Sequence, residues 1–267
     1  MLFKSKKCST CQAYFDPTLE QCPTCHNHNE LYERERALKH AFFFHPAAQI
    51  GLFLAGFAYA GMIFAEIFVS IFLMGVFDEV LKTTLTVFFS YLLLFGTLMI
   101  IIFTTRWRSF FKRFTRPLDY AFGVGYAVIA VLAGIILGLI ISAFYKGGDN
   151  TNQSTAVDIS LNYPILSGII LCFFGPVCEE LTYRVGFYSF FRRINLYLAM
   201  IVSTIFFAFI HFDFTAKDMV NELWSLPSYL ISGIILGIAY EHRGPACSFT
   251  AHIVYNIYAF SMIFIDR

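Results

Sequence analysis

Residues 118–144 read LDYAFGVGYAVIAVLAGIILGLIISAF, and this stretch decides the class of fold. After Asp119 it has no charged side chain, and it exceeds the roughly 20 apolar residues that a helix needs to cross a bilayer. The whole chain agrees with it: 58% of the residues are hydrophobic and only 14% are charged. This composition excludes an ordinary soluble globule. We therefore expect an all-α polytopic membrane protein.

Further apolar runs predict further membrane spans on both sides of this one. In total about seven spans are expected, near residues 48–77, 83–104, 118–144, 162–190, 195–213, 226–241 and 246–265. The polar run KGGDNTNQSTAVDIS, residues 146–160, is expected to be an external loop. A formal net charge of +1 gives no reason to expect a nucleic-acid partner.

The positions of Lys and Arg predict the orientation in the membrane. The first residues, MLFKSKKCST, are basic but lack the apolar segment of a secretory signal, so we expect the N-terminus in the cytosol and the C-terminus outside. With seven spans, 14 basic residues then fall on the inner side: Lys4, Lys6, Lys7, Arg34, Arg36, Lys39, Arg106, Arg108, Lys112, Arg113, Arg116, Arg192, Arg193 and Arg243. Four fall outside: Lys82, Lys146, Lys217 and Arg267. This asymmetry follows the positive-inside rule and favours a multi-pass protein of the cell membrane.

Four cysteines near the N-terminus predict a metal site. Residues 8–25 read CSTCQAYFDPTLEQCPTC, so Cys8, Cys11, Cys22 and Cys25 form two C-x2-C pairs. Two such pairs can close a tetrahedral thiolate site around zinc, which would replace the hydrophobic core that so short a segment lacks. A redox dithiol pair or unliganded thiols are the alternatives. We expect a cytosolic zinc ribbon over residues 1–28, a connecting helix over 29–46 and a transmembrane domain over 47–267.

The fourth predicted span carries three charged residues. It contains GPVCEELTYRVGF, residues 175–187, with Glu179, Glu180 and Arg184 in an apolar helix. Charges at membrane depth are costly unless they are paired or hydrated, so they indicate an internal polar cavity. Glu180 and Arg184 are four residues apart and can pair, which leaves Glu179 for other work. An interfacial cluster at the cytosolic end is the alternative.

Two later spans carry histidines. The fifth contains Phe207 and His211 in FAFIH, and the seventh contains His252 and Asn256 in HIVYN. A single membrane histidine is more often a hydrogen-bond donor between helices than a catalyst. However, if spans four and five form a hairpin that turns near residues 192–195, Glu179 and His211 lie roughly 21 Å and 27 Å from the turn and can meet. His252 and Asn256 lie one helical turn apart and can face the same cavity.

In these residues the chain resembles the CAAX protease and bacteriocin-processing family of membrane peptidases, also called Abi proteins. The family's motifs EExxxR, FxxxH and HxxxN occur here in order over residues 160–260. They fall on Glu179, Glu180 and Arg184, on Phe207 and His211, and on His252 and Asn256. The resemblance implies an intramembrane endopeptidase, with the ribbon as an accessory.

The motif residues supply the groups that peptide hydrolysis needs. Glu179 is the candidate general base and His211 would hold or polarise the attacking water, while His252 and Asn256 could stabilise the oxyanion. Glu180 and Arg184 would be supporting. Glu179, His211 and His252 could also ligate a catalytic zinc, although HExxH is absent from the sequence. The dependence on a catalytic metal stays open, and the substrate would be a membrane-associated peptide or protein.

Other functions remain as alternatives. A non-catalytic immunity or scaffold protein could use the same cavity to bind, and a transporter could use the Glu and His groups as a proton relay. The sequence shows neither repeats nor paired broken helices of the kind that transporters have. A further acid, Glu66 in the first span, is better explained by a hydrogen bond to a neighbouring helix than by catalysis.

Overall fold

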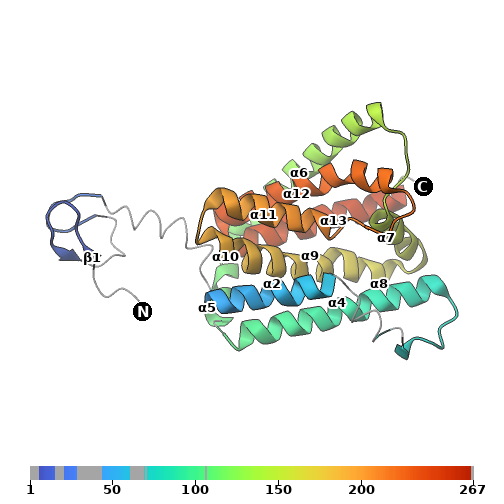
Figure 1. Ribbon diagram of the computed structural model, residues 1–267, viewed down its shortest axis with the longest axis horizontal. Helices are drawn as coiled ribbons and strands as arrows, with labels where there is room; N and C mark the ends of the chain where they lie inside the picture. The colour runs from blue at the N-terminus through green and yellow to red at the C-terminus, as the bar shows by residue number, and fades with distance from the viewer. Residues whose placement is uncertain are drawn as a thin grey trace.

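The computed structural model describes residues 6–15, 21–28, 44–60, 69, 71–105 and 107–265. The helices lie side by side in a bundle, and the N-terminal strands lie apart from it (Figure 1). In chain order the α-helices are α2 (Pro46–Ala60), α4 (Glu79–Phe103), α5 (Trp107–Phe111), α6 (Pro117–Phe144), α7 (Thr151–Asn162), α8 (Pro164–Ile169), α9 (Gly175–Glu179), α10 (Ser189–Arg192), α11 (Leu196–Phe209), α12 (Met219–Arg243) and α13 (Pro245–Ile265). A 3-10 helix, η1 (Lys112–Phe114), follows α5.

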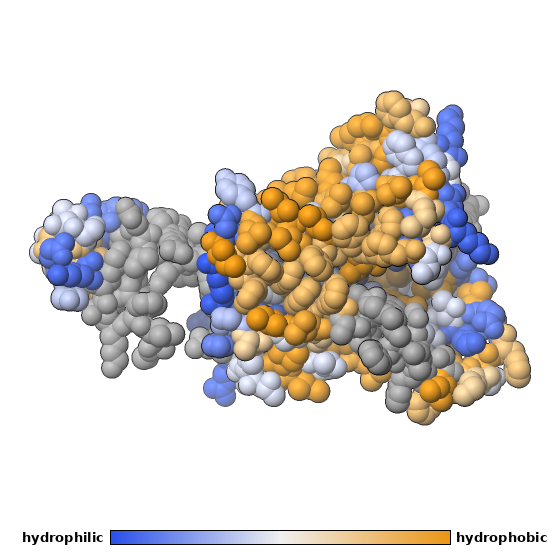
Figure 2. All heavy atoms as spheres, in the orientation of Figure 1, coloured by the Kyte–Doolittle hydropathy of each residue, from blue (hydrophilic) through white to orange (hydrophobic). Residues whose placement is uncertain are grey.

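Five of the described helical stretches are long and apolar enough to cross a membrane. They are Glu79–Phe103, Pro117–Phe144, Pro164–Arg192, Met219–Arg243 and Pro245–Ile265. Two shorter apolar helices, Pro46–Phe57 and Leu196–Phe209, stand where the first and fifth spans are expected. The expected all-α membrane fold is therefore confirmed, whereas the number of seven spans stays a prediction. Figure 2 shows the broad apolar surface of the bundle, with polar residues gathered at its two ends.

The two ends of the bundle differ in charge. Because successive spans alternate in direction, residues 104–116, 192–195 and 243–244 share one end, where Figure 1 shows α5 and α10. We call it the basic end, since it carries Arg108, Lys112, Arg113, Arg116, Arg192, Arg193 and Arg243. The other end, the α7 end, holds α7, residues 210–218 and the end of α13 (Figure 1). Its described basic residues are Lys82, Lys146 and Lys217.

The fourth span is not a regular α-helix. Two π-helical segments, η2 (Ile170–Phe174) and η3 (Glu180–Tyr188), join α8, α9 and α10 into one continuous helix. All nine residues of η3 are buried, and α2 packs closely against it. A Cβ atom on Gly186 would lie 3.0 Å from both the Gln49 carbonyl oxygen and the Phe53 nitrogen, so only glycine permits this approach. Small residues at helix contacts are typical of membrane bundles.

The structure changes two expectations, and two others fall on residues outside the described ranges. The run 146–160 is not wholly a loop, because Thr151 starts α7 and the Asn150 side chain caps it by accepting a 2.9 Å hydrogen bond from the Gln153 N–H. The proposed connecting helix over 29–46 lies almost entirely outside the described residues, and so does Glu66. The fifth helix also ends earlier than expected, at Phe209, so that His211 lies beyond it.

The N-terminal unit is built on two short strands. β1 (Lys6–Lys7) and β2 (Tyr14–Phe15) pair antiparallel, with Lys6 opposite Phe15, and an isolated bridge joins Gln21 to His28. Cys8, Phe15 and Cys22 form a small buried cluster against which Cys11 and Cys25 pack. A core of this size cannot hold a domain together by hydrophobic burial, so it needs a further constraint.

Candidate functional site

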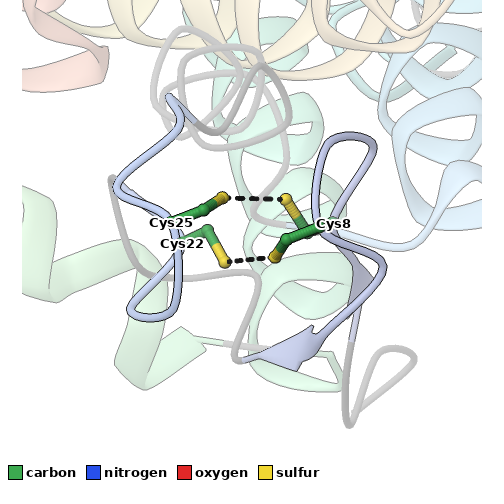
Figure 3. A group of neighbouring side chains, drawn as sticks. Cys8, Cys22 and Cys25 are labelled. Carbon is green, nitrogen blue, oxygen red and sulfur yellow. Dashed lines mark hydrogen bonds between the residues drawn. The ribbon is translucent and has the colours of Figure 1, made fainter.

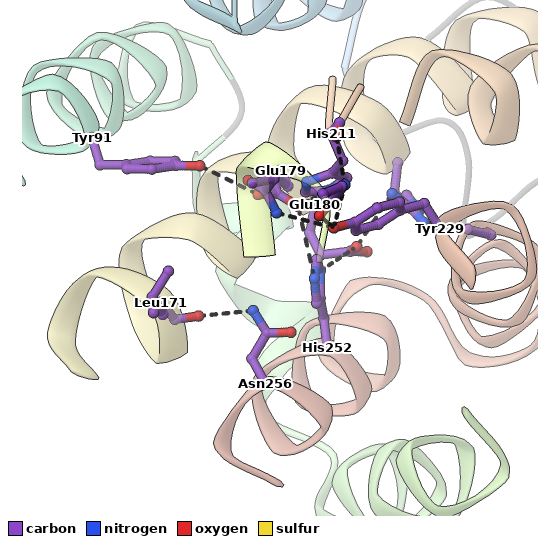
Figure 4. A network of polar contacts seen from close by, with 12 residues as sticks. Tyr91, Leu171, Glu179, Glu180, His211, Tyr229, His252 and Asn256 are labelled. Atoms are coloured by element: carbon purple, nitrogen blue, oxygen red, sulfur yellow. Dashed lines mark hydrogen bonds and ion pairs between the residues drawn. The ribbon is translucent and has the colours of Figure 1, made fainter. Parts of the chain in front are cut away.

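The fourth span places two consecutive glutamates in different surroundings. Glu179 ends α9 and is 9% exposed, and Glu180 begins η3 and is fully buried. Because neighbouring helical residues point in different directions, Glu180 faces Arg184 and His252, while Glu179 faces Tyr91 and the two histidines (Figure 4). The two carboxylates therefore belong to separate parts of one polar network.

Glu180 is held by two cationic or polar partners. Its Oε1 atom lies 3.5 Å from Arg184 Nη1 and 3.1 Å from His252 Nδ1. The Arg184 guanidinium also donates a 3.2 Å hydrogen bond to the Gly233 carbonyl oxygen and lies 4.3 Å from the centroid of the Phe207 ring. These contacts offset part of the cost of burying the charges. They also fix the His252 ring, because one of its nitrogens is held by a carboxylate.

Glu179 meets both histidines at a single oxygen. Its Oε2 atom lies 3.8 Å from His211 Nε2 and 3.7 Å from His252 Nε2, and its Oε1 atom accepts a 3.4 Å hydrogen bond from the Tyr91 hydroxyl. Both separations at Oε2 exceed direct hydrogen-bonding distance, and Oε2 has no hydrogen-bond partner although it is buried. A buried oxygen without a partner between two imidazoles is where a water or another small ligand would bind.

His211 depends on neighbouring elements for its position. The Asn150 side chain donates a 3.3 Å hydrogen bond to its carbonyl oxygen, and the Tyr229 ring stacks on its imidazole with centroids 4.4 Å apart. The buried Glu222 carboxylate joins the two loops beside it, because Oε1 accepts from the Thr151 N–H at 2.8 Å and Oε2 accepts from the Asp213 N–H at 3.1 Å. His211 is therefore positioned by α7 and α12 as well as by α11.

Asn256 satisfies a carbonyl that the π-helix leaves free. In η2 the Gly175 N–H bonds to the Ile170 carbonyl, and Pro176 has no N–H, so the Leu171 carbonyl loses its usual helical donors. Asn256 Nδ2 donates a 2.8 Å hydrogen bond to this oxygen (Figure 4). An amide NH2 group has two N–H bonds, so one donor of Asn256 is still available.

All four candidate catalytic residues line one cavity. It has a volume of about 420 Å³, and Glu179, His211, His252 and Asn256 contribute to its wall together with Tyr91. Ligand cavities of this size, with polar groups that converge in an apolar surround, are typical of small-molecule and substrate sites. Glu180 and Arg184 lie behind the wall.

Glu179, His211 and His252 are spaced close to, and slightly more widely than, three zinc ligands. Zn–N and Zn–O bonds of about 2.0–2.2 Å at tetrahedral angles imply N···O separations of roughly 3.3–3.5 Å. The observed separations at Glu179 Oε2 are 3.7 and 3.8 Å. Among the described residues, the group of metal-ligating side chains whose ligand atoms all lie within 4.8 Å of one another is the cysteine cluster.

The four cysteines are arranged as a metal site would require. Cys8 Sγ lies 3.6 Å from Cys25 Sγ, and Cys11 Sγ lies 3.6 Å from Cys22 Sγ (Figure 3). Tetrahedral Zn–S bonds of about 2.3 Å imply S···S separations of roughly 3.8 Å. The backbone N–H groups of Cys11 and Thr10 lower the pKa of Cys8 to about 6, whereas burial and hydrogen bonds with the other cysteines raise the pKa of Cys11 to about 12, so the four thiols share their protons unevenly.

The two cysteine turns also repeat one backbone geometry. The Gln12 N–H bonds to the Cys8 carbonyl and the His26 N–H bonds to the Cys22 carbonyl. Gln12 and His26 both have positive φ, at 62° and 57°. This conformation costs free energy in a residue other than glycine, so two equivalent instances point to a constraint that acts on both turns.

Sequence reasoning did not identify Tyr91, Asn150, Glu222 or Tyr229. Tyr91 and Tyr229 stand among many aromatic residues of membrane helices, so nothing in their spacing separates them from lipid-facing rings. Asn150 carries a weak signal, because Asn before a polar helix is a common N-cap. Glu222 carries the signal of an acid close to an apolar run.

A known protein family matches the part of the chain that carries the three motifs. Residues 161–258 match the family model Rce1-like, described as type II CAAX prenyl endopeptidase Rce1-like. The match includes all seven motif residues and excludes the N-terminal cysteines, α4 and all but the last two residues of α7. No curated protein and no solved structure matches the chain.

Proposed function

We propose that this chain, whose residues 161–258 belong to the Rce1-like family, is an intramembrane endopeptidase in which Glu179 activates the attacking water. The family match supports a CAAX-type membrane protease in general. The observation that carries the mechanism is the buried Glu179 Oε2 atom, which lacks a hydrogen-bond partner and lies between two imidazole nitrogens. The substrate would be a membrane-associated peptide or protein.

In the proposed reaction Glu179 takes a proton from water as the oxygen attacks the peptide carbonyl carbon. The proton then passes to the leaving amine as the C–N bond breaks, so that Glu179 ends as it began. His211 and His252 hold the water in line. The Nδ1 atom of His252 faces the Glu180 carboxylate and therefore carries a proton, so in the neutral ring Nε2 can accept a hydrogen bond from the water.

The carbonyl oxygen becomes an oxyanion in this step and needs donors. The second N–H of Asn256 is the candidate donor. Glu180 and Arg184 act by positioning: they anchor His252 and place a compensating positive charge behind the site. A metal held by Glu179, His211 and His252 would supply a Lewis acid in the same place, and chelation of the purified protein distinguishes the two forms of the enzyme.

We propose two further features of the chain. The N-terminal cysteines hold one structural zinc ion, because four thiol groups converge with separations close to those of a tetrahedral site. The N-terminus and the basic end face the cytosol, because Lys and Arg are concentrated there, and the C-terminus faces outward.

Replacement of the proposed base tests the function. Glu179→Gln keeps the size of the side chain and removes the base, so membrane peptides that the wild type cleaves should accumulate in cells that carry this variant. Glu241→Gln is the matched control, since Glu241 is a membrane-helix glutamate outside the cavity that pairs with Arg192 at 2.8 Å. Peptide profiles of the wild type and the control should agree. Full cleavage by Glu179→Gln would contradict the mechanism.

A further inference from the structure

A tyrosine lies at the middle of helix α4. Tyr91 stands 12 residues after Glu79 and 12 residues before Phe103, and it is the only tyrosine of α4, which contains four phenylalanines. Tyrosines of membrane helices gather near the two interfaces, where the hydroxyl reaches water. At the middle of an apolar span a hydroxyl without a hydrogen-bond partner costs free energy, so this position calls for a partner inside the protein.

The partner of the Tyr91 hydroxyl is the proposed base. The hydroxyl points at Glu179 from a separate helix and donates a 3.4 Å hydrogen bond to its Oε1 atom (Figure 4). This hydrogen bond is long, as those of catalytic groups often are before substrate binds. A Cβ atom on Gly175 would lie 3.8 Å from both Tyr91 Cζ and Glu179 Oε1, so the two groups meet beside the residue at which η2 ends.

Aromatic contacts hold the face of α4 that carries Tyr91. Phe88, Tyr91 and Phe95 are three and four residues apart, so they share one face of the helix. The rings of Phe88 and Phe95 both contact the ring of Phe174 in η2, with centroids 6.1 Å and 5.4 Å from it. This face is therefore held against the fourth span on both sides of Tyr91. Since phenylalanine serves at both neighbouring positions, packing alone does not require the hydroxyl of Tyr91.

The two oxygens of Glu179 face different groups. Oε1 faces Tyr91, and Oε2 lies 3.8 Å and 3.7 Å from the Nε2 atoms of His211 and His252. The last torsion of a glutamate side chain has broad energy minima, so the plane of a free carboxylate turns easily. A quarter turn would move Oε2 away from the imidazole nitrogens. A donor that is fixed at Oε1 opposes this rotation.

We infer that Tyr91 is a positioning residue for Glu179. Its hydroxyl holds Oε1, and Oε2 thereby stays beside the two imidazoles, where the attacking water would bind. This inference rests on the proposed peptidase function and extends its machinery to α4, which lies outside the residues that match the family model. A hydroxyl that only attached α4 to the fourth span would contribute to stability and not to the rate of the chemical step, so the two roles are separable.

Removal of a single oxygen atom tests the inference. Tyr91→Phe keeps the ring and loses the hydroxyl. Tyr163→Phe is the matched control, because the Tyr163 hydroxyl donates a 3.2 Å hydrogen bond to the carboxylate of Asp78, the N-cap of α4, and so also joins α4 to the start of the fourth span. Neither Tyr163 nor Asp78 is among the described residues that line the cavity.

The purified full-length variants are compared on a membrane peptide that accumulates in cells with Glu179→Gln. We expect Tyr91→Phe to lower kcat by about 10- to 100-fold and to change KM by less than about twofold, because the position of the base is lost and the binding of substrate is not. Tyr163→Phe should keep the kcat and the KM of the wild type. A wild-type kcat in Tyr91→Phe, or an equal loss of kcat in Tyr163→Phe, would overturn the inference.

An infrared measurement tests the contact without cleavage. The carboxylate band of Glu179, identified by the difference between the spectra of the wild type and Glu179→Gln, should shift in Tyr91→Phe and stay in place in Tyr163→Phe. An unshifted band in Tyr91→Phe would overturn the inference. If Glu179→Gln abolishes cleavage but Tyr91→Phe cleaves like the wild type, the peptidase mechanism stands and the positioning role fails. If Glu179→Gln still cleaves fully, the peptidase mechanism fails even where the band shows the contact.

Discussion

The aromatic ring of Tyr229 lies parallel to the imidazole of His211, with centroids 4.4 Å apart and an interplanar angle of 11°. His211 lies beyond the end of α11, so its own helix does not fix the ring. The Tyr229 hydroxyl is in turn held at 3.3 Å and 3.1 Å by the amides of Asn150 and Asn152. The Tyr229 ring, stacked on His211 and held at its hydroxyl by Asn150 and Asn152, therefore restricts the motion of the imidazole.

Tyr229→Leu should therefore reduce cleavage by roughly 10- to 100-fold, because a displacement of about 1 Å at a reacting group can have effects of that size. Tyr229→Phe keeps the stacked ring and loses only the hydroxyl contacts, so it should retain most of the activity. Cleavage rates of the two purified variants check this order. Equal losses in both would show that the hydroxyl, rather than the stack, carries the effect.

Glu179 and His211 should behave as one unit. Each of Glu179→Gln and His211→Ala should lower the rate by about 10²- to 10⁴-fold, because proton transfer and the position of the water are lost. The double variant should be scarcely slower than either single one, since residues that act on the same step are not additive. Losses that multiply in the double variant would argue that the two residues act independently.

Asn256 has a structural contact and a proposed catalytic one, and two variants should separate them. Asn256→Ala leaves the Leu171 carbonyl without its donor, which should lower stability by about 1–3 kcal/mol and also reduce the rate. Asn256→Asp removes both N–H donors and places a carboxylate against the carbonyl, so it should be worse in thermal unfolding and in kcat. An unchanged melting temperature in both variants would show that the Leu171 contact has no structural role.

Arg184 should differ in kind from the cavity residues. Arg184→Ala leaves the buried Glu180 without its ion-pair partner, which should lower stability by about 3–5 kcal/mol and reduce expression together with activity. Combining Arg184→Ala with Glu180→Gln removes the unpaired charge. Thermal unfolding of the double variant should therefore show that stability is recovered. Activity should recover less, because His252 then loses its carboxylate anchor. A stable Arg184→Ala single variant would contradict this account.

If the cysteine cluster binds zinc, metal analysis of the purified protein should give about one zinc per chain. Replacing Cys22 and Cys25 together with Ser should remove it, whereas Cys172→Ser, outside the cluster, should not. Zinc should dissociate on acidification, because the ligands are thiolates and protons compete with the metal for them. Full zinc retention in the double serine variant would rule out this site.

Much of the fold follows from local sequence alone. Continuous apolar runs of about 20 or more residues favour membrane helices, because a helix satisfies all of its backbone hydrogen bonds within one segment in lipid, and barrel strands are only about half as long. The stretches around 79–103, 117–144, 164–192, 219–243 and 245–265 were identifiable for this reason. The paired C-x2-C spacing likewise depends only on a short segment, and the order of the three motifs was enough to indicate the family whose model matches residues 161–258.

The tertiary structure decided everything that depends on which atoms meet. The π-helical segment η2 and Pro176, which has no N–H, together leave the Leu171 carbonyl free for Asn256. Tyr91 and Tyr229 become neighbours of Glu179 and His211 only when distant helices pack, and no periodicity encodes that. The cavity is also a tertiary property. Sequence set the charge of each end, but only side-chain packing determined which residues of α7, α12 and α13 line the cavity with Glu179.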